Sequence, residues 1–100
     1  MAITIGRYTF EGPFESTFSI EDRSGIYAVL SHNGLRYDVV DIGESATVRS
    51  RIESHDRADC WARYGGRYYA VYYTPFSQQP ARKQIEQELR RQYNPPCGDR

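Results

Sequence analysis

The sequence predicts an α+β domain in which a small three-stranded antiparallel sheet is flanked by helices and preceded by an N-terminal β extension. Two runs rich in β-branched and aromatic residues surround an Asn-Gly dipeptide within residues 24–55, a pattern that favours a hairpin. Residues 45–55 and 80–93 carry apolar residues at helical spacing. A chain of 100 residues has room for one such domain. We assign residues 1–23 to the extension and residues 24–98 to the core of the domain.

The N-terminal extension is predicted from short β-type runs. Residues 3–10 read as a strand, residues 11–13 as a turn containing Gly and Pro, and residues 17–20 as a second short strand. We expect this segment to add a hairpin or to extend one edge of the sheet. It carries no side chains that indicate chemistry.

Three strands form the predicted core sheet. Residues 25–31 are apolar at consecutive positions, which is typical of a central strand buried on both faces. Residues 35–42 pair with it through a tight type I′ turn at Asn33-Gly34. Residues 67–74 form the third strand, whose four tyrosines alternate between the two faces.

Two helices are predicted from apolar spacing and end signals. Ser45 is a suitable N-cap, and Val48, Ile52 and His55 then recur on one helix face. Residues 56–66 are expected to be a loop containing Trp61. A second helix begins at about Pro80, buries a stripe of Ile85, Leu89 and Tyr93, and ends before two prolines.

Charge is balanced overall but unevenly distributed. The formal net charge is zero, which argues against a strongly basic, indiscriminate nucleic-acid binder. Residues 1–48 contain three arginines and seven acidic residues, whereas residues 49–100 contain ten basic and six acidic residues. Any anion-binding face should therefore come from the second half of the chain.

Two cysteines are too few for the disulfide framework of a small secreted protein. The first residues do not resemble a secretory leader, and no apolar run is long enough to span a bilayer. We therefore expect a soluble, cytoplasmic protein with reduced thiols and no membrane partner. His55, Cys60 and Cys97 have ligand types that suit zinc, but without a Cys-x-x-Cys pair buried thiols are the favoured interpretation.

Five sequence elements occur in an order and spacing that resemble the GIY-YIG nuclease family. They are Gly25-Ile26-Tyr27, Asp41-Ile42-Gly43, Arg51, His55, and the run Ile85-Glu86-Gln87-Glu88-Leu89 followed by Tyr93-Asn94-Pro95-Pro96. The resemblance spans residues 25–98. The chain departs from the family pattern at Asp41, where the second motif begins with tyrosine, and at Gly98, where an asparagine often closes the motif.

The resemblance implies a metal-dependent endonuclease that hydrolyses phosphodiester bonds in DNA, with RNA as an alternative substrate. Glu86 would hold one Mg²⁺ or Mn²⁺ ion, a role that suits a carboxylate. Tyr27, helped by His55 or Asp41, would align and deprotonate the attacking water. Arg51 would neutralise the phosphate, whose geometry a guanidinium matches. We expect all five side chains to converge on one concave, solvent-accessible surface.

Each of these residues also has an ordinary structural interpretation. Tyr27 could be a core tyrosine, Arg51 a solvated helix charge, and His55 a histidine near a helix C-terminus. Glu86 could belong to an ion-pair ladder with the arginines four residues before and after it. Asp41 could accept a water proton or bind the metal, repel phosphate, or pair with Arg51.

A catalytically degenerate GIY-YIG-fold module that binds nucleic acid or protein is the alternative function. Asp41, Gly98 and the zero net charge favour it. A third interpretation makes the tyrosines of residues 67–74 a surface for a homodimer or for a separate recognition partner, because tyrosine is enriched at interfaces.

Overall fold

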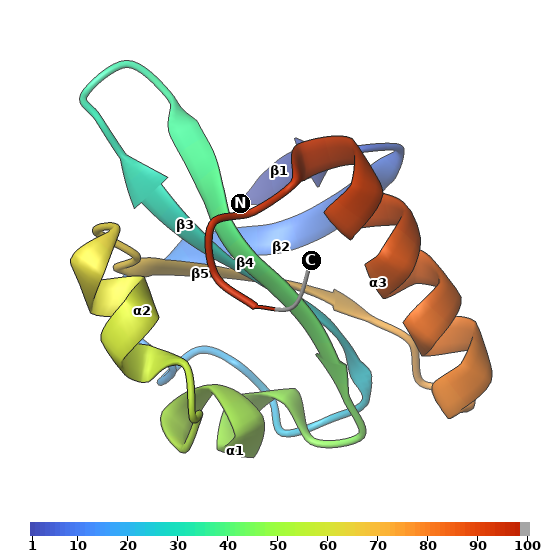
Figure 1. Cartoon of the computed structure of the whole chain (residues 1–100). Coiled ribbons are helices and arrows are strands. Elements are labelled where there is room, and N and C mark those ends of the chain that lie inside the picture. The colour runs from blue at the N-terminus through green and yellow to red at the C-terminus, as the bar shows by residue number, and fades with distance from the viewer. Residues whose placement is uncertain (99–100) are drawn as a thin grey trace.

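The computed structural model describes residues 1–98, which form an α+β fold of one antiparallel sheet and three helices (Figure 1). The strands are β1 (Ala2–Ile5), β2 (Tyr8–Phe14), β3 (Gly25–His32), β4 (Tyr37–Ser45) and β5 (Tyr68–Tyr73). The helices are α1 (Val48–Glu53), α2 (Ala58–Arg63) and α3 (Gln79–Tyr93). The strand order β1-β2-β5-β3-β4 places β3 inside the sheet and β4 at one edge.

The sheet has five strands, so the prediction of a three-stranded sheet is wrong. The chain reverses at Gly6, with φ of +62°, and β2 continues through the residues predicted as a turn. β2 then pairs with β5, so the N-terminal extension belongs to the same sheet. Residues 17–20 form turns rather than a second strand, although Ile20 at their end is buried.

The core strands follow the sequence pattern closely. β3 has six consecutive buried residues and pairs with β4 on one side and β5 on the other. Gly25 begins it because a Cβ there would lie 2.5 Å from the carbonyl oxygen of Tyr72. The predicted type I′ turn is wrong: four residues, 33–36, join β3 to β4, and the Asn33 side chain accepts the Leu35 and Arg36 amides.

Helices cover both faces of the sheet (Figure 1). α1 and α2 pack on one face over a cluster of buried residues: Ile20, Tyr27, Val29, Val40, Val48, Ile52, Trp61, Val71 and Cys97. α3 packs on the other over a second cluster: Ile5, Phe10, Ile26, Ala28, Leu30, Ile42, Ala70 and Leu89. The alternation predicted for the tyrosines of β5 is confirmed, because Tyr69 and Tyr73 pack with the first cluster and Tyr68 and Tyr72 with the second.

The predicted helix at residues 80–93 is confirmed, but the one at 45–55 is shorter than expected. Ser45 is the last residue of β4 and not an N-cap, and α1 begins at Val48. Asp22 from the preceding loop accepts the Ser50 amide at 3.0 Å near the start of α1. Because α1 ends at Glu53, His55 lies in the turn before α2 rather than on a helix. The predicted loop 56–66 contains α2.

The end of the described chain covers the edge of β4. Val29 pairs with Asp41 and Leu30 with Val39, so Val40 is the extra residue of a bulge. Its carbonyl oxygen accepts the Cys97 amide at 3.1 Å. In Figure 1 the segment after α3 crosses in front of β4. This segment partly closes an edge that would otherwise present unpaired backbone groups.

Cys60 on α2 and Cys97 form a disulfide, so the prediction of reduced thiols and the zinc alternative are both wrong. The two residues are 37 apart in the sequence, and only the return of the chain across β4 brings their Cα atoms to 5.9 Å. Among residues 1–98, no helix has the length and apolar character that crossing a membrane requires.

Gly43 provides a test of how β3 and β4 fit together. A Cβ at this position would overlap the hydroxyl and ring of Tyr27. We therefore expect Gly43→Ala to lower the free energy of unfolding by about 2–3 kcal/mol through overpacking. Gly65→Ala is the control, because its Cβ would make only an ordinary van der Waals contact, 3.8 Å from Ser31 Cβ, but its φ of +73° is strained for alanine; about 1 kcal/mol is expected. Urea denaturation measures both, and equal losses would contradict the proposed overlap.

Candidate functional site

Tyr27 and His55 form the centre of the candidate site. Tyr27 extends from β3 across Gly43, its partner on β4. Its hydroxyl lies 2.6 Å from His55 Nε2, and the edge of its ring faces Trp61. Tyr27 is 1% exposed and the His55 side chain is fully buried. The absence of a side chain at Gly43 is what lets the tyrosine lie flat enough to reach the histidine.

The hydrogen bonds of His55 fix its tautomer. The Arg57 amide donates to His55 Nδ1 at 3.0 Å. Burial, together with the charges of Arg51 and Arg57, lowers the pKa of His55 to about 4. We therefore assign a neutral ring at neutral pH, with its proton on Nε2 and donated to the Tyr27 hydroxyl oxygen. Burial, reinforced by the charge of Asp41, raises the pKa of Tyr27, so the phenol keeps its own proton.

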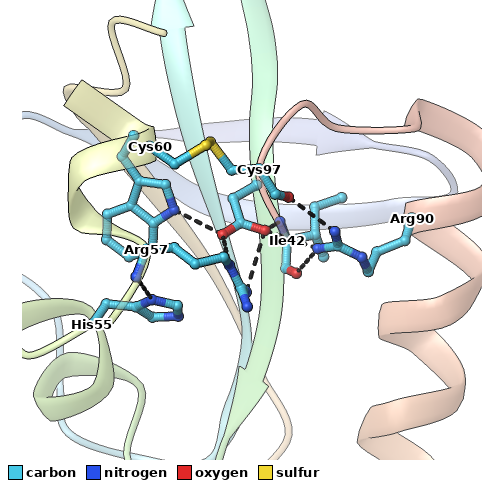
Figure 2. Close-up of a disulfide and its surroundings, with 8 residues drawn as sticks. Ile42, His55, Arg57, Cys60, Arg90 and Cys97 are labelled. Carbon is cyan, nitrogen blue, oxygen red and sulfur yellow. Dashed lines mark hydrogen bonds and ion pairs between the residues drawn. A yellow bond between two sulfur atoms is a disulfide. The ribbon is translucent and has the colours of Figure 1, made fainter. Parts of the chain in front are cut away.

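Asp41 organises a second, adjacent network (Figure 2). Its carboxylate accepts hydrogen bonds from Arg57 Nε at 2.8 Å, Arg90 Nη1 at 2.8 Å and Trp61 Nε1 at 2.7 Å. The carboxylate is 0% exposed. We refer to Asp41, Arg57, Trp61 and Arg90 as the Asp41 network. It joins β4 to α2 on one side and to α3 on the other.

The Asp41 network decides among the alternatives considered for this residue. Asp41 pairs with arginines, as one alternative held, but its partners are Arg57 and Arg90 rather than Arg51. Two guanidinium groups and an indole N–H occupy its oxygens in a region closed to solvent. In this arrangement Asp41 stabilises the fold and has no oxygen turned toward water or a metal ion.

Arg51 lies on α1 at the surface of the site. It donates to Asp56 at 3.0 Å, and its side chain is 38% exposed. Exposed ion pairs of this kind contribute at most about 1 kcal/mol. The guanidinium can therefore exchange Asp56 for another anion at little cost.

Glu86 lies half-buried on α3, and within residues 1–98 its carboxylate has no ion pair or hydrogen bond. The expected ladder with its helical neighbours is not formed, because Arg82 binds Glu44 and Arg90 binds Asp41. Burial and then the charge of Glu44 raise the pKa of Glu86. A half-buried carboxylate without a partner is the feature of this region that most favours cation binding.

The predicted residues come together only in part. Tyr27 and His55 are in contact, and the charges of Asp41, Arg51 and Glu86 all act on the pKa of Tyr27. Arg51 and Glu86 are carried by α1 and α3, which pack on opposite faces of the sheet, so the expectation that these two side chains meet on one face is wrong. The expectation that all five line a solvent-accessible surface is wrong for Tyr27 and Asp41, which are buried.

Several important residues were missed from the sequence. Arg57 both pairs with Asp41 and fixes the His55 ring through its backbone amide. Trp61 was placed in a loop, and Arg90 was considered only as a neighbour of Glu86. The one available signal was that Trp61 is the single tryptophan of the chain, close to five arginines between residues 49 and 67.

The candidate metal ligands of this region can be compared with what a divalent cation requires. No group of three or more His, Cys, Asp or Glu side chains within residues 1–98 is arranged to hold a metal ion. Mg²⁺ needs less, because it commonly binds one or two carboxylates and completes its shell with water and substrate phosphate. Glu86 fits that requirement as the principal ligand, whereas the neighbouring Glu44 is held by Arg82.

No protein-family model, curated protein or solved structure matches this chain. The resemblance to the GIY-YIG family therefore rests on the residues and their order alone.

Removing the charge of Asp41 should destabilise the protein strongly. Asp41→Asn keeps the size of the side chain but removes the negative charge to which two partly buried guanidinium groups donate. We expect a loss of about 3–5 kcal/mol in the free energy of unfolding. Asp38→Asn is the matched control on the same strand, since Asp38 makes an exposed pair with Arg36; it should cost under about 1 kcal/mol. Similar losses for the two variants in urea denaturation would contradict this role.

The low pKa of His55 makes stability depend on pH. As the pH falls, the unfolded chain protonates His55 near 6.5, whereas the folded chain does so only near 4. Acid therefore favours unfolding, and stability should fall by about 2 kcal/mol between pH 7 and pH 5 on this account. His55→Gln should remove most of this dependence. Urea denaturation across this range tests it, and an unchanged slope in the variant would refute it.

Proposed function

We propose that this chain is a metal-dependent endonuclease that hydrolyses phosphodiester bonds in DNA, with RNA as an alternative substrate. The observation that carries the proposal is the half-buried Glu86 carboxylate, which has no ion-pair partner in residues 1–98. The charge of Glu86 contributes to the raised pKa of Tyr27, and the charge of Arg57 acts to lower the pKa of Glu86. A carboxylate coupled to a tyrosine, a histidine and arginines fits the residue types that phosphodiester hydrolysis requires.

Glu86 would hold Mg²⁺ or Mn²⁺, with water and phosphate oxygens as the remaining ligands. Such an ion lowers the pKa of a bound water and stabilises the leaving oxygen. Arg51 would bind the scissile phosphate after releasing Asp56, since their exposed pair is weak. The guanidinium would then stabilise the charge that builds on the phosphate during attack.

Tyr27 and His55 would orient the attacking water. Because its pKa is raised, the Tyr27 hydroxyl remains protonated at neutral pH and serves as a hydrogen-bond donor rather than as a base. His55 holds the hydroxyl oxygen in place through Nε2. In this proposal the tyrosine positions the water, and proton removal depends on the ion held by Glu86.

A catalytically degenerate GIY-YIG-type module that binds nucleic acid or protein is the second candidate. Two observations favour it: the Tyr27 hydroxyl lies below the surface, and Asp41 occupies the guanidinium groups of Arg57 and Arg90. Under either candidate we place the chain in the cytoplasm, as its sequence led us to expect. A homodimer or a separate recognition partner remains a prediction that light scattering can test.

Glu86→Gln separates the two candidates. The substitution keeps size and helix propensity but removes the charge needed to hold a divalent ion. Nicking of supercoiled plasmid with Mg²⁺ or Mn²⁺ should fall by at least about 100-fold, consistent with loss of a metal-dependent step. The melting temperature should stay level or rise, because the buried negative charge is unfavourable in the folded protein.

Glu88→Gln is the matched control on the same helix. Glu88 pairs with Arg7 at the surface, away from the site, so its loss should leave cleavage unchanged. Calorimetric titration with Mn²⁺ should detect binding to wild type and to Glu88→Gln but not to Glu86→Gln. Wild-type protein that neither binds the ion nor cuts duplex, branched or single-stranded DNA, or RNA, would transfer the assignment to the degenerate module.

A further inference from the structure

Residues 94–98 form a strap that crosses the edge of β4, and it has few attachments. The Cys97 amide donates to the Val40 carbonyl at 3.1 Å, and Arg90 Nη2 donates to the Cys97 carbonyl at 2.9 Å. Pro95 and Cys97 are buried beneath neighbouring side chains. Besides the backbone that continues from α3, the disulfide to Cys60 links the strap covalently to α2 (Figure 2).

The disulfide connects the two halves of the Asp41 network. Cys60 lies on α2 beside Trp61, which donates to Asp41. Cys97 accepts from Arg90, which also donates to Asp41 from α3. Figure 2 shows the disulfide lying alongside this network, with Arg57 and Arg90 on opposite sides. The bond therefore holds α2 and the end of α3 together around β4.

The two cysteine residues differ in their exposure. Cys60 is partly exposed, whereas Cys97 is 0% exposed and packed in the cluster beneath α1 and α2. Thiol–disulfide exchange requires a thiolate to approach one sulfur along the bond. The geometry directs that attack to Cys60 and makes Cys97 the leaving group.

We propose that the Cys60–Cys97 disulfide is a redox-sensitive latch that a dithiol reductant opens. One thiolate of the reductant attacks Cys60 Sγ, the bond between the two protein sulfurs breaks, and Cys97 leaves as a thiolate that takes up a proton. The second thiol of the reductant then displaces Cys60 and closes into a cyclic disulfide. A low-molecular-weight disulfide reverses the reaction and is itself reduced to thiols.

Opening the latch releases the strap rather than unfolding the domain. The ladders of β3 with β4 and β5 contain no residue of the strap, and the cluster under α3 contains none either. Among the described residues, the hydrogen bond from Cys97 to Val40, the contact with Arg90 and the burial of Pro95 and Cys97 would still hold residues 94–98 on β4 after reduction. Elements with few attachments open locally at a lower free energy than the core.

This inference goes beyond the proposed function and does not depend on it, because the latch is defined by contacts and not by cleavage. Opening it loosens the arginine side of the Asp41 network, close to the candidate site. Its test uses structural readouts, so its failure would leave the nuclease proposal untouched.

Residue-resolved hydrogen exchange of the full chain, measured by NMR at set ratios of reduced and oxidised dithiothreitol, tests the latch. Reduction should speed exchange of the Cys97 amide at least about tenfold, while the Val71 amide in the central sheet changes little. Thiol titration in parallel should rise from zero to two per chain and return on reoxidation. In the double variant Cys60→Ser/Cys97→Ser, the amide of residue 97 should exchange rapidly at every ratio of reduced to oxidised dithiothreitol.

Three results would overturn the latch. The first is two free thiols in folded protein prepared without reductant, which would mean that the bond does not form. The second is equal acceleration at residue 97 and at Val71, which would make the disulfide a global brace. The third is full reduction with no change in exchange at residue 97. All three are measured on wild-type protein, so the proposal stays testable if the double variant fails to fold.

Discussion

The buried carboxylate of Asp41 is the constraint on which the arrangement of this fold depends. A charge removed from water is tolerable only when other groups compensate it fully, and here two guanidinium groups and an indole N–H do so. Two of these donors come from α2 and the residue before it, and the third comes from α3. The two helices lie on opposite faces of the sheet. Apolar packing fixes each helix against its own face. The carboxylate fixes the helices on the two faces relative to each other.

The same interaction limits what the candidate site can do. Arg57 and Arg90 are positioned beside β4, where an anion could bind, but both already donate to the single carboxylate of Asp41. The groups left for chemistry are the exposed Arg51, the Tyr27–His55 pair beneath the surface, and the Glu86 carboxylate, which has no ion pair within residues 1–98. At the position where the resemblance implies a catalytic hydroxyl, this chain therefore has a buried carboxylate that pairs with two arginines.

The sequence was sufficient to predict elements with strong periodicity, and it was insufficient for features that depend on contacts between distant residues. β3, β5 and α3 were predicted close to their bounds because apolar runs or long helical stripes mark them. α2 was missed because six residues carry too little periodic signal, and short helices depend on tertiary packing. The pairing of β2 with β5 joins residues more than 50 apart, which no local pattern reveals. In the site, the motif order anticipated that Tyr27 and His55 belong together, whereas the partners of Asp41 follow from strand register and from α2.

The bulge at Val40 has a consequence for association between molecules. By turning one carbonyl toward the strap, it helps occupy the β4 edge, where Arg90 also binds the Ile42 carbonyl. β1 is then the remaining terminal strand of the sheet. Addition of a foreign strand is therefore favoured at the β1 edge over the partly covered β4 edge. Two copies that met at β1 about a two-fold axis would use the β1 edge of each, so growth through that edge would stop at a pair.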